Sequence, residues 1–243
     1  MNTKFLKWAL PAFALTVAGS QPVEAKIPGK TSFGGRVGYQ SMGLKGKKYV
    51  GGSLLAGAPP SGIRRVNNHY SGAAGDLFVS HDIVLSSFSV GIEGYVGSST
   101  VETGRIIHTP VAGVLDMHTT IDKDYTVGAR LKLGHYLWSD VLLYASLGVE
   151  NTRFKVKHIY ASFPPTAPQV NGSSKSYHLW GVVPGVGMQL NMHNDWRCQI
   201  DATYAMYDLS REVSGSANIA SYSYHLHMRP RVFGLTIGFS RFF

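Results

Sequence analysis

Long stretches of the sequence alternate, residue by residue, between an apolar side and a small or polar side. Between 141 and 150 the apolar set is Val141, Leu143, Ala145, Leu147 and Val149, and the same period recurs over 88–97, 125–134 and 233–240. Segments 75–85 and 196–207 alternate less regularly. A period of two is typical of β-strands whose two faces meet different surroundings. The sequence therefore predicts an all-β chain.

Composition excludes several other classes of protein. Only 15% of the residues are Asp, Glu, Lys or Arg, against about 25% in ordinary soluble domains. After residue 25 the longest apolar run is 141–149, which is about half the roughly 18 residues of a membrane helix. The single Cys198 forms no intrachain disulfide and no structural zinc site by itself. Disorder, coiled coil and helical membrane protein are excluded.

Short polar breaks and long hydrophilic segments divide the chain into repeats. The breaks lie at 86–87, 138–140 and 193–195, and the longer segments, rich in Gly, Ser, Pro and charge, lie at 43–74, 99–122, 161–175 and 214–226. With a first strand near 31–42 and a last strand ending at Phe243, this spacing predicts eight strands joined by short turns and long loops.

The N-terminus predicts export. Lys4 and Lys7 precede an apolar stretch from Trp8 to Ala18, and the segment 23–25 approximates a small-x-small cleavage signal. We interpret residues 1–25 as a removable signal peptide and residues 26–243 as a single domain.

The character of the polar face decides which face of the strands points into the barrel. It is small and sparsely charged, with glycines at 34, 38, 91, 128, 134, 148, 181, 185 and 187, which suits a narrow barrel interior. The apolar face then points to lipid, where closure of the barrel pairs every strand edge. We predict an eight-stranded antiparallel transmembrane β-barrel, with short periplasmic turns and long extracellular loops. A soluble lipocalin-like ligand-binding barrel, apolar inside, is the alternative orientation.

Three short motifs carry a family resemblance: FSVGIEG at 88–94, LYASLGV at 143–149, and WGVVPGVGM at 180–188 leading to Asp195 and Trp196. In their order and spacing over 31–243, the chain resembles the opacity-protein and surface-antigen family of small Gram-negative outer-membrane barrels. The resemblance implies a bacterial outer-membrane location, a non-enzymatic surface role, and recognition of Phe243 by the outer-membrane assembly machinery. Arg241 departs from the pattern, which usually has an aromatic or apolar residue there, and this departure predicts a slip of the last strand by one residue. Pro184 predicts a bulge or bend.

Charged residues on the polar face form a predicted ionic network inside the barrel. Its members are Arg36, Glu93, Arg130, Lys132, Glu150, Arg197 and Asp201. The favoured role is structural, with Arg130 and Glu150 coupled across adjacent strands, and an ion or proton pathway is the alternative. Trp138 and Trp196 flank short turns, where their rings suit a membrane interface.

Other chemistry has weaker support. A lipid-A-modifying barrel enzyme is the alternative function, suggested by the spacing of His69 and Ser71 with Asp76 following, but sequence proximity does not make a nucleophile–base pair. His225 and His227 lack a carboxylate or cysteine to complete a metal site. The glycine-rich stretch 34–38 lacks the strand–loop–helix context of a phosphate loop. We predict no cofactor and no metal.

The first long loop has a basic bias, carried by Lys45, Lys47, Lys48, Arg64 and Arg65 with no acid before Asp76. A basic external rim attracts anionic glycans, host surface molecules or lipid headgroups. Nucleic acid is disfavoured because no recognised module accompanies the charge. The predicted function is an outer-membrane surface protein that is structural in the envelope and presents basic loops for adhesion or contact with a host.

Overall fold

The computed structural model describes residues 29–52, 64–103, 106–111, 115–162, 171–217 and 220–243. The expected signal peptide, residues 1–25, lies outside these ranges, so its cleavage stays a prediction. No described residue belongs to a helix with the length and apolarity needed to cross a membrane.

Ten β-strands make up the described chain. Their bounds are β1 (Lys30–Gly52), β2 (Arg64–Leu85), β3 (Phe88–Ser99), β4 (Ile106–Val111), β5 (Leu115–Tyr136), β6 (Val141–Ser162), β7 (Asn171–Asn191), β8 (Trp196–Tyr207), β9 (Leu209–Ala217) and β10 (Ala220–Phe242).

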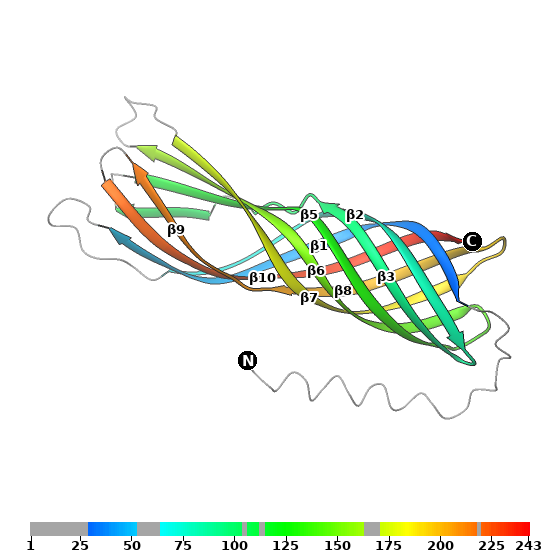
Figure 1. Cartoon of the computed structure of the whole chain (residues 1–243). Coiled ribbons are helices and arrows are strands. Elements are labelled where there is room, and N and C mark those ends of the chain that lie inside the picture. The colour runs from blue at the N-terminus through cyan, green and yellow to red at the C-terminus, as the bar shows by residue number, and fades with distance from the viewer. Residues whose placement is uncertain (1–28, 53–63, 104–105, 112–114, 163–170, 218–219) are drawn as a thin grey trace, which may run out of the picture.

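Eight of the strands close into an antiparallel barrel. The order is β1-β2-β3-β5-β6-β7-β8-β10, and β1 pairs with β10 to close the ring. Strand β4 pairs with β5 beyond the end of β3, and β9 pairs with β10 beyond the end of β8. The eight-stranded antiparallel barrel is therefore confirmed. The start of β1 and the C-terminus lie at the same end of the molecule (Figure 1).

Short turns gather at that end, which we call the turn end. The β2–β3 hairpin turns at residues 86–87, β5–β6 at 137–140 and β7–β8 at 192–195, as the polar breaks predicted. Ser86, Asn194 and Asp195 have φ values of 58°, 61° and 62°. This left-handed conformation matches the twist of tight hairpins, and Asn and Asp tolerate it better than most residues.

In the part of the chain that the structure describes, the segments predicted as long loops are largely paired strands. Strands β1 and β2 continue their ladder up to the Lys48–Arg64 pair, and β5 and β6 continue to the Leu115–Ser162 pair. The predicted loop segments are therefore mostly strand, and the strands extend far beyond the barrel at the end opposite the turns (Figure 1). These segments are rich in Gly, Ser and charged residues, a composition typical of loops. Strands outside the apolar zone tolerate such residues as well, because strand propensity depends on the surroundings of each side chain.

The strand register is regular where the sequence predicted disturbance. The β1–β10 register runs without a shift from Ser32–Phe242 to Gly52–Tyr222, so Arg241 causes no slip. Pro184 interrupts the β7–β8 ladder between the Val182–Met206 and Gly185–Thr203 pairs without changing its register. Proline lacks the N–H that the ladder needs. The predicted bulge is therefore absent, and two pairs of the β7–β8 ladder are missing instead.

The outward residues of the barrel change from apolar to polar and charged along the length of the strands. On β6 the outward residues Leu143, Leu147 and Val149 are exposed, and Leu147 is 61% exposed. Further from the turns the outward residues become Asn151, Arg153, Lys155 and Lys157, whereas the inward residues Phe154 and Val156 are fully buried. The alternation thus inverts within one continuous strand. The apolar outer zone is called the belt, and the strands beyond it are called the extension.

The height of the belt suits a bilayer. On β5 the outward apolar residues run from Tyr125 to Leu137. At about 3.3 Å per residue and a strand tilt of about 40°, that distance spans roughly 30 Å, close to the roughly 25 Å apolar band plus interfacial aromatics of outer-membrane barrels. Trp138 and Trp196 are exposed at the turn end of the belt, and Trp180 is exposed at the other end.

Closure of the barrel depends on a glycine of β1. A Cβ atom added at Gly38 would lie 2.1 Å from the Leu235 carbonyl oxygen, whereas one at Gly94 would meet nothing within 4 Å. Gly38→Ala should therefore separate β1 from β10 and destabilise the folded barrel by about 1–3 kcal/mol, as overpacking does. Urea unfolding in detergent micelles measures the loss. Gly94→Ala is the matched control and should leave the urea midpoint equal to that of wild type within error. If Gly38→Ala also leaves the midpoint unchanged, the contact between β1 and β10 relaxes to make room for the added methyl group.

Candidate functional site

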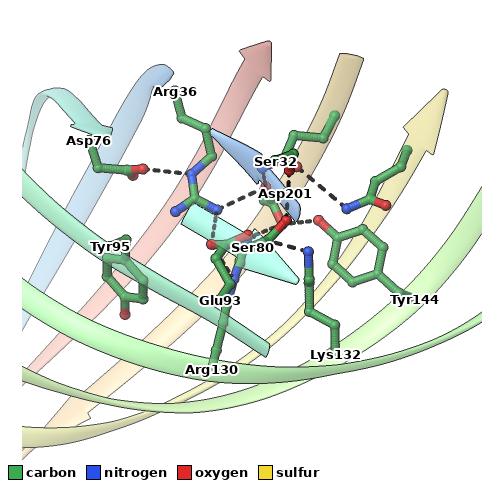
Figure 2. A network of polar contacts seen from close by, with 12 residues as sticks. Ser32, Arg36, Asp76, Ser80, Glu93, Tyr95, Arg130, Lys132, Tyr144 and Asp201 are labelled. Carbon is green, nitrogen blue, oxygen red and sulfur yellow. Dashed lines mark hydrogen bonds and ion pairs between the residues drawn. The ribbon is translucent and has the colours of Figure 1, made fainter. Parts of the chain in front are cut away.

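The barrel interior within the belt holds an ionic network built on Glu93. Arg36 Nη1 lies 2.7 Å from Glu93 Oε1, Arg130 Nε lies 2.9 Å from the same oxygen, and Lys132 Nζ lies 3.4 Å from Oε2. Glu93 is fully buried, and the three cations come from β1 and β5 (Figure 2). One carboxylate thus joins side chains that lie far apart in sequence.

Three further acids complete the network. Arg36 Nε donates to Asp76 Oδ1 at 2.7 Å, and Arg197 Nη1 donates to Asp82 Oδ2 at 2.6 Å. Asp201 lies 3.0 Å from Arg130 Nη2 as an ion pair without hydrogen-bond geometry, and it accepts a hydrogen bond from the Tyr144 hydroxyl. Figure 2 shows Arg36, Asp76, Arg130, Tyr144 and Asp201 converging inside the barrel.

Glu150 has other partners than the acids that bind the arginines of the network. It accepts hydrogen bonds from the hydroxyl of Tyr95, at 2.8 Å, and from the hydroxyl of Tyr207. The ion pairs described for Arg130 go to Glu93 and Asp201 instead. The structure therefore gives no direct pair between Arg130 and Glu150. The alternation placed both residues inside, but it could not choose between neighbouring acids.

The charges inside the barrel balance. Among the described residues, the five inward cations are Arg36, Lys123, Arg130, Lys132 and Arg197, and the five inward acids are Asp76, Asp82, Glu93, Glu150 and Asp201. Buried charges are tolerated when they are paired and hydrogen bonded. By formal count, the described interior residues therefore carry no excess charge of either sign.

Sequence reasoning missed Asp76 and Asp82 as members of the network. Both lie on β2, where Phe78 obscures the alternation because it also points inward. The Arg36 guanidinium carbon lies 4.7 Å from the centroid of the Phe78 ring, so this aromatic residue is part of the polar layer through a cation–π contact. The signal that could have found Asp82 is its spacing from Ser80 on the same strand face.

Beyond the ionic network the interior becomes apolar. Met42, Leu44, Ile121, Phe154 and Val156 are fully buried and form one cluster with Val101, Leu179, Val183, Ala205, Tyr207 and Val232. The Phe154 and Tyr207 rings meet edge to face with centroids 5.1 Å apart. This cluster, which we call the apolar plug, fills the base of the extension. The alternation did not predict this apolar interior, because most of these residues lie outside the segments in which the alternation was recognised.

The residues considered for the alternative enzyme function do not converge. His69 and Ser71 lie on the outer face of β2, exposed, whereas Asp76 points inward to Arg36. Opposite faces of one strand cannot supply a nucleophile, a base and an orienting carboxylate to one point. The described residues contain no cluster of metal-ligating side chains, and the side chains of His225 and His227 lie outside the described part of the chain.

The predicted basic loop is a pair of strands. Lys45, Lys47 and Lys48 belong to β1, and Arg64 and Arg65 belong to β2; the ladder sets Lys47 opposite Arg65 and Lys48 opposite Arg64. Their side chains lie outside the described residues. Phe243 is exposed, and its backbone N–H donates to the Thr31 carbonyl at 3.0 Å. Its recognition by an assembly machinery stays a prediction.

A closed eight-stranded antiparallel barrel with an apolar exterior and a filled interior is the architecture of small outer-membrane barrels. No protein-family model and no curated protein matches the sequence. Among solved structures, the chain is similar to Ail, the attachment invasion locus protein of Yersinia pestis, at a TM-score of 0.32 and 16% identity over 85% of this chain and 99% of Ail.

The chain is also similar to two other solved structures. OprG of Pseudomonas aeruginosa has a TM-score of 0.41 at 13% identity, over 88% of this chain and 97% of OprG. The outer membrane protease OmpT of Escherichia coli has a TM-score of 0.43 at 7% identity, over 93% of this chain and 99% of OmpT. At such identities the likeness concerns the fold alone.

Proposed function

We propose that the chain is a non-enzymatic barrel of the bacterial outer membrane, of the opacity-protein type, exported through residues 1–25. It is structural in the envelope and presents its extension to anionic polymers outside the cell. The observation that carries the proposal is the inversion of exterior polarity along continuous strands, from the exposed Leu147 to Arg153 and Lys157 on β6. Lipid accounts for an apolar exterior, and water accounts for a charged one.

The same exposures argue against a lipocalin-like barrel. Such a barrel would keep its apolar face inside around a ligand cavity. Here Val37, Leu131 and Leu147 face outward and are more than 60% exposed, whereas the inward Arg130 and Glu93 are buried. The enzyme alternative loses its support as well, because Asp76 is on the opposite face from His69 and Ser71.

Cysteine labelling of intact cells tests the membrane topology. In a Cys198→Ser background, single cysteines replace Ser176 in the extension, Leu147 in the belt and Ser139 in the turn between β5 and β6. A membrane-impermeant maleimide should label Ser176→Cys in intact cells and Ser139→Cys only after permeabilisation, because the bilayer separates them. Leu147→Cys should react only after denaturation, since lipid covers it.

Two outcomes would contradict the proposal. Labelling of Ser139→Cys in intact cells with Ser176→Cys protected would invert the topology. Equal labelling of all three positions without permeabilisation would mean that no bilayer surrounds the belt.

A further inference from the structure

A small cavity lies inside the barrel at the turn end. Its volume is about 160 Å³, and its walls come from β1, β2, β5, β7, β8 and β10 together with the β7–β8 turn. Pockets for whole small-molecule ligands measure about 300–1,000 Å³, and one water takes about 30 Å³ of liquid. The cavity therefore suits an end group of about five non-hydrogen atoms rather than a nucleotide or an oligosaccharide. Its polar lining includes Lys30, Asp82, Tyr136, Asn191, Asp195 and Arg197.

Arg197 reaches the cavity from β8 with one hydrogen-bond donor left over. Its side chain is 3% exposed, and its Nη1 donates to Asp82 Oδ2 at 2.6 Å. The Nε atom is buried and has no hydrogen-bond partner among the described residues. The hydroxyl of Ser240, which pairs with Arg197 across β8 and β10, is buried in the same way without a described partner. A buried donor without an acceptor is costly, so an acceptor atom bound at this point stabilises the barrel.

Lys30 is a second cation of the cavity, and it has no ion pair within the described part of the chain. Its Nζ lies 5.1 Å from the centroid of the Phe242 ring, and the guanidinium carbon of Arg197 lies 4.2 Å from the same centroid. Asp82 pairs with Lys30 across β1 and β2, but its carboxylate is shared between Arg197 and Lys132, whose Nζ lies 3.3 Å from Oδ1. The charge of Lys30 is therefore left without a partner acid.

The charge of the cavity favours a carboxylate as its ligand. Asp195 is the other acid of the lining, but it is exposed at the rim, in the β7–β8 turn, where water and salt screen it. The inner part of the cavity thus carries one uncompensated positive charge. A carboxylate brings one negative charge and two acceptor oxygens, which suffice for charge-assisted hydrogen bonds from Arg197 Nε and Lys30 Nζ. A phosphate brings up to about two negative charges, more than the cavity balances.

We propose that this cavity binds the carboxylate group of a small acid or of the end of a peptide, held by Arg197 Nε and Lys30 Nζ. The site follows from the geometry of the turn end and does not depend on a membrane. The side from which its ligand comes does rest on the outer-membrane location proposed above, because in that location the turn end faces the periplasm.

Titration of acetate into the refolded full chain in dodecylphosphocholine micelles tests the proposal. NMR of the Arg197 Nε–Hε group should show a shift that saturates. Lys30→Gln should weaken the apparent affinity about tenfold, as the loss of a hydrogen bond to a charged group does. Arg241→Gln is the matched control, because Arg241 lies at the same end of the barrel but is exposed on the outward face of β10. It should change the affinity less than about twofold.

Asn191→Asp supplies a carboxylate from the chain itself. Asn191 lines the cavity and pairs with Arg197 across β7 and β8, and the two side chains are nearly equal in size. The variant should move the Arg197 Nε–Hε resonance toward its acetate-bound position without added acetate. It should also abolish the response to acetate, because the added charge occupies Arg197 and repels a second carboxylate.

N-acetylalanine distinguishes the two sources of the carboxylate. Tighter binding than acetate assigns the cavity to the end of a peptide, and weaker binding assigns it to a free acid.

Three results would overturn the proposal. Absence of a saturable shift in the wild type would mean that water alone binds Arg197 Nε. Equal weakening by Lys30→Gln and Arg241→Gln would mean that the general charge of the turn end, and not the cavity, attracts acetate. Tighter binding of inorganic phosphate than of acetate would contradict the choice of a carboxylate. None of these results depends on the membrane topology, which the cysteine labelling tests separately.

Discussion

Glu93→Gln is expected to destabilise the barrel by about 3–5 kcal/mol, the cost of removing one partner from a buried ion pair. Arg36, Arg130 and Lys132 all lie within 3.4 Å of the Glu93 carboxylate, which is fully buried. A neutral amide leaves these cations with less compensation than in the wild type, in an interior where water cannot replace it. Urea unfolding in detergent micelles, followed by the mobility shift between folded and unfolded forms, measures the loss.

A double-mutant cycle identifies the source of that loss. Arg130→Met alone should be strongly destabilising, and Glu93→Gln/Arg130→Met should be less destabilising than the sum of the two, by about 1–3 kcal/mol. The matched cycle of Arg130 with Glu150 should show a much smaller coupling, because Glu150 is held by Tyr95 and Tyr207. Strict additivity of Glu93 with Arg130, or stronger coupling of Arg130 to Glu150, would contradict the network as described.

The alternation predicted the strands and their inner faces well because period two is a local property. It failed at the ends of the strands, where Arg153 and Lys157 continue the outward positions of Leu147 and Val149 on β6. The period does not change there, and only the hydropathy of each face does. A segment rich in Gly, Ser and charged residues is predicted as a loop when only its overall composition is considered. The apolar residues at alternate positions, here Phe154 and Val156, indicate a strand instead.

The partners inside the barrel could not be predicted, because they depend on tilt and register around the ring. Arg197 meets Asp82 across 115 positions of sequence, and Arg36 meets Asp201 across 165. Alternation says only that such residues point inward. Which acid each arginine reaches is set by the stagger of eight strands, and for that reason the sequence suggested Glu150 as the partner of Arg130.

Phe154→Ala tests whether the apolar plug is a second stabilising unit, separate from the ionic network. Phe154 is fully buried on β6 and packs against Tyr207. Truncating a buried phenylalanine costs about 3–5 kcal/mol. Because the plug fills the base of the extension, we expect this cost to appear as local opening of the extension while the barrel in the belt stays folded.

Limited trypsin digestion measures that opening at Lys155 and Lys157, which flank Val156 on β6. A loss of about 3–5 kcal/mol raises the open population, and with it the cleavage rate, by at least about a hundredfold. Leu147→Ala, which shortens an outward side chain of the belt, is the control and should leave the cleavage rate near that of wild type. Glu93→Gln should do the reverse of Phe154→Ala, lowering the urea midpoint of the barrel with little change in cleavage of the extension. If Phe154→Ala instead lowers the urea midpoint as much as Glu93→Gln does, the plug and the network unfold as one unit, because the strands that run through both zones transmit the loss from one to the other.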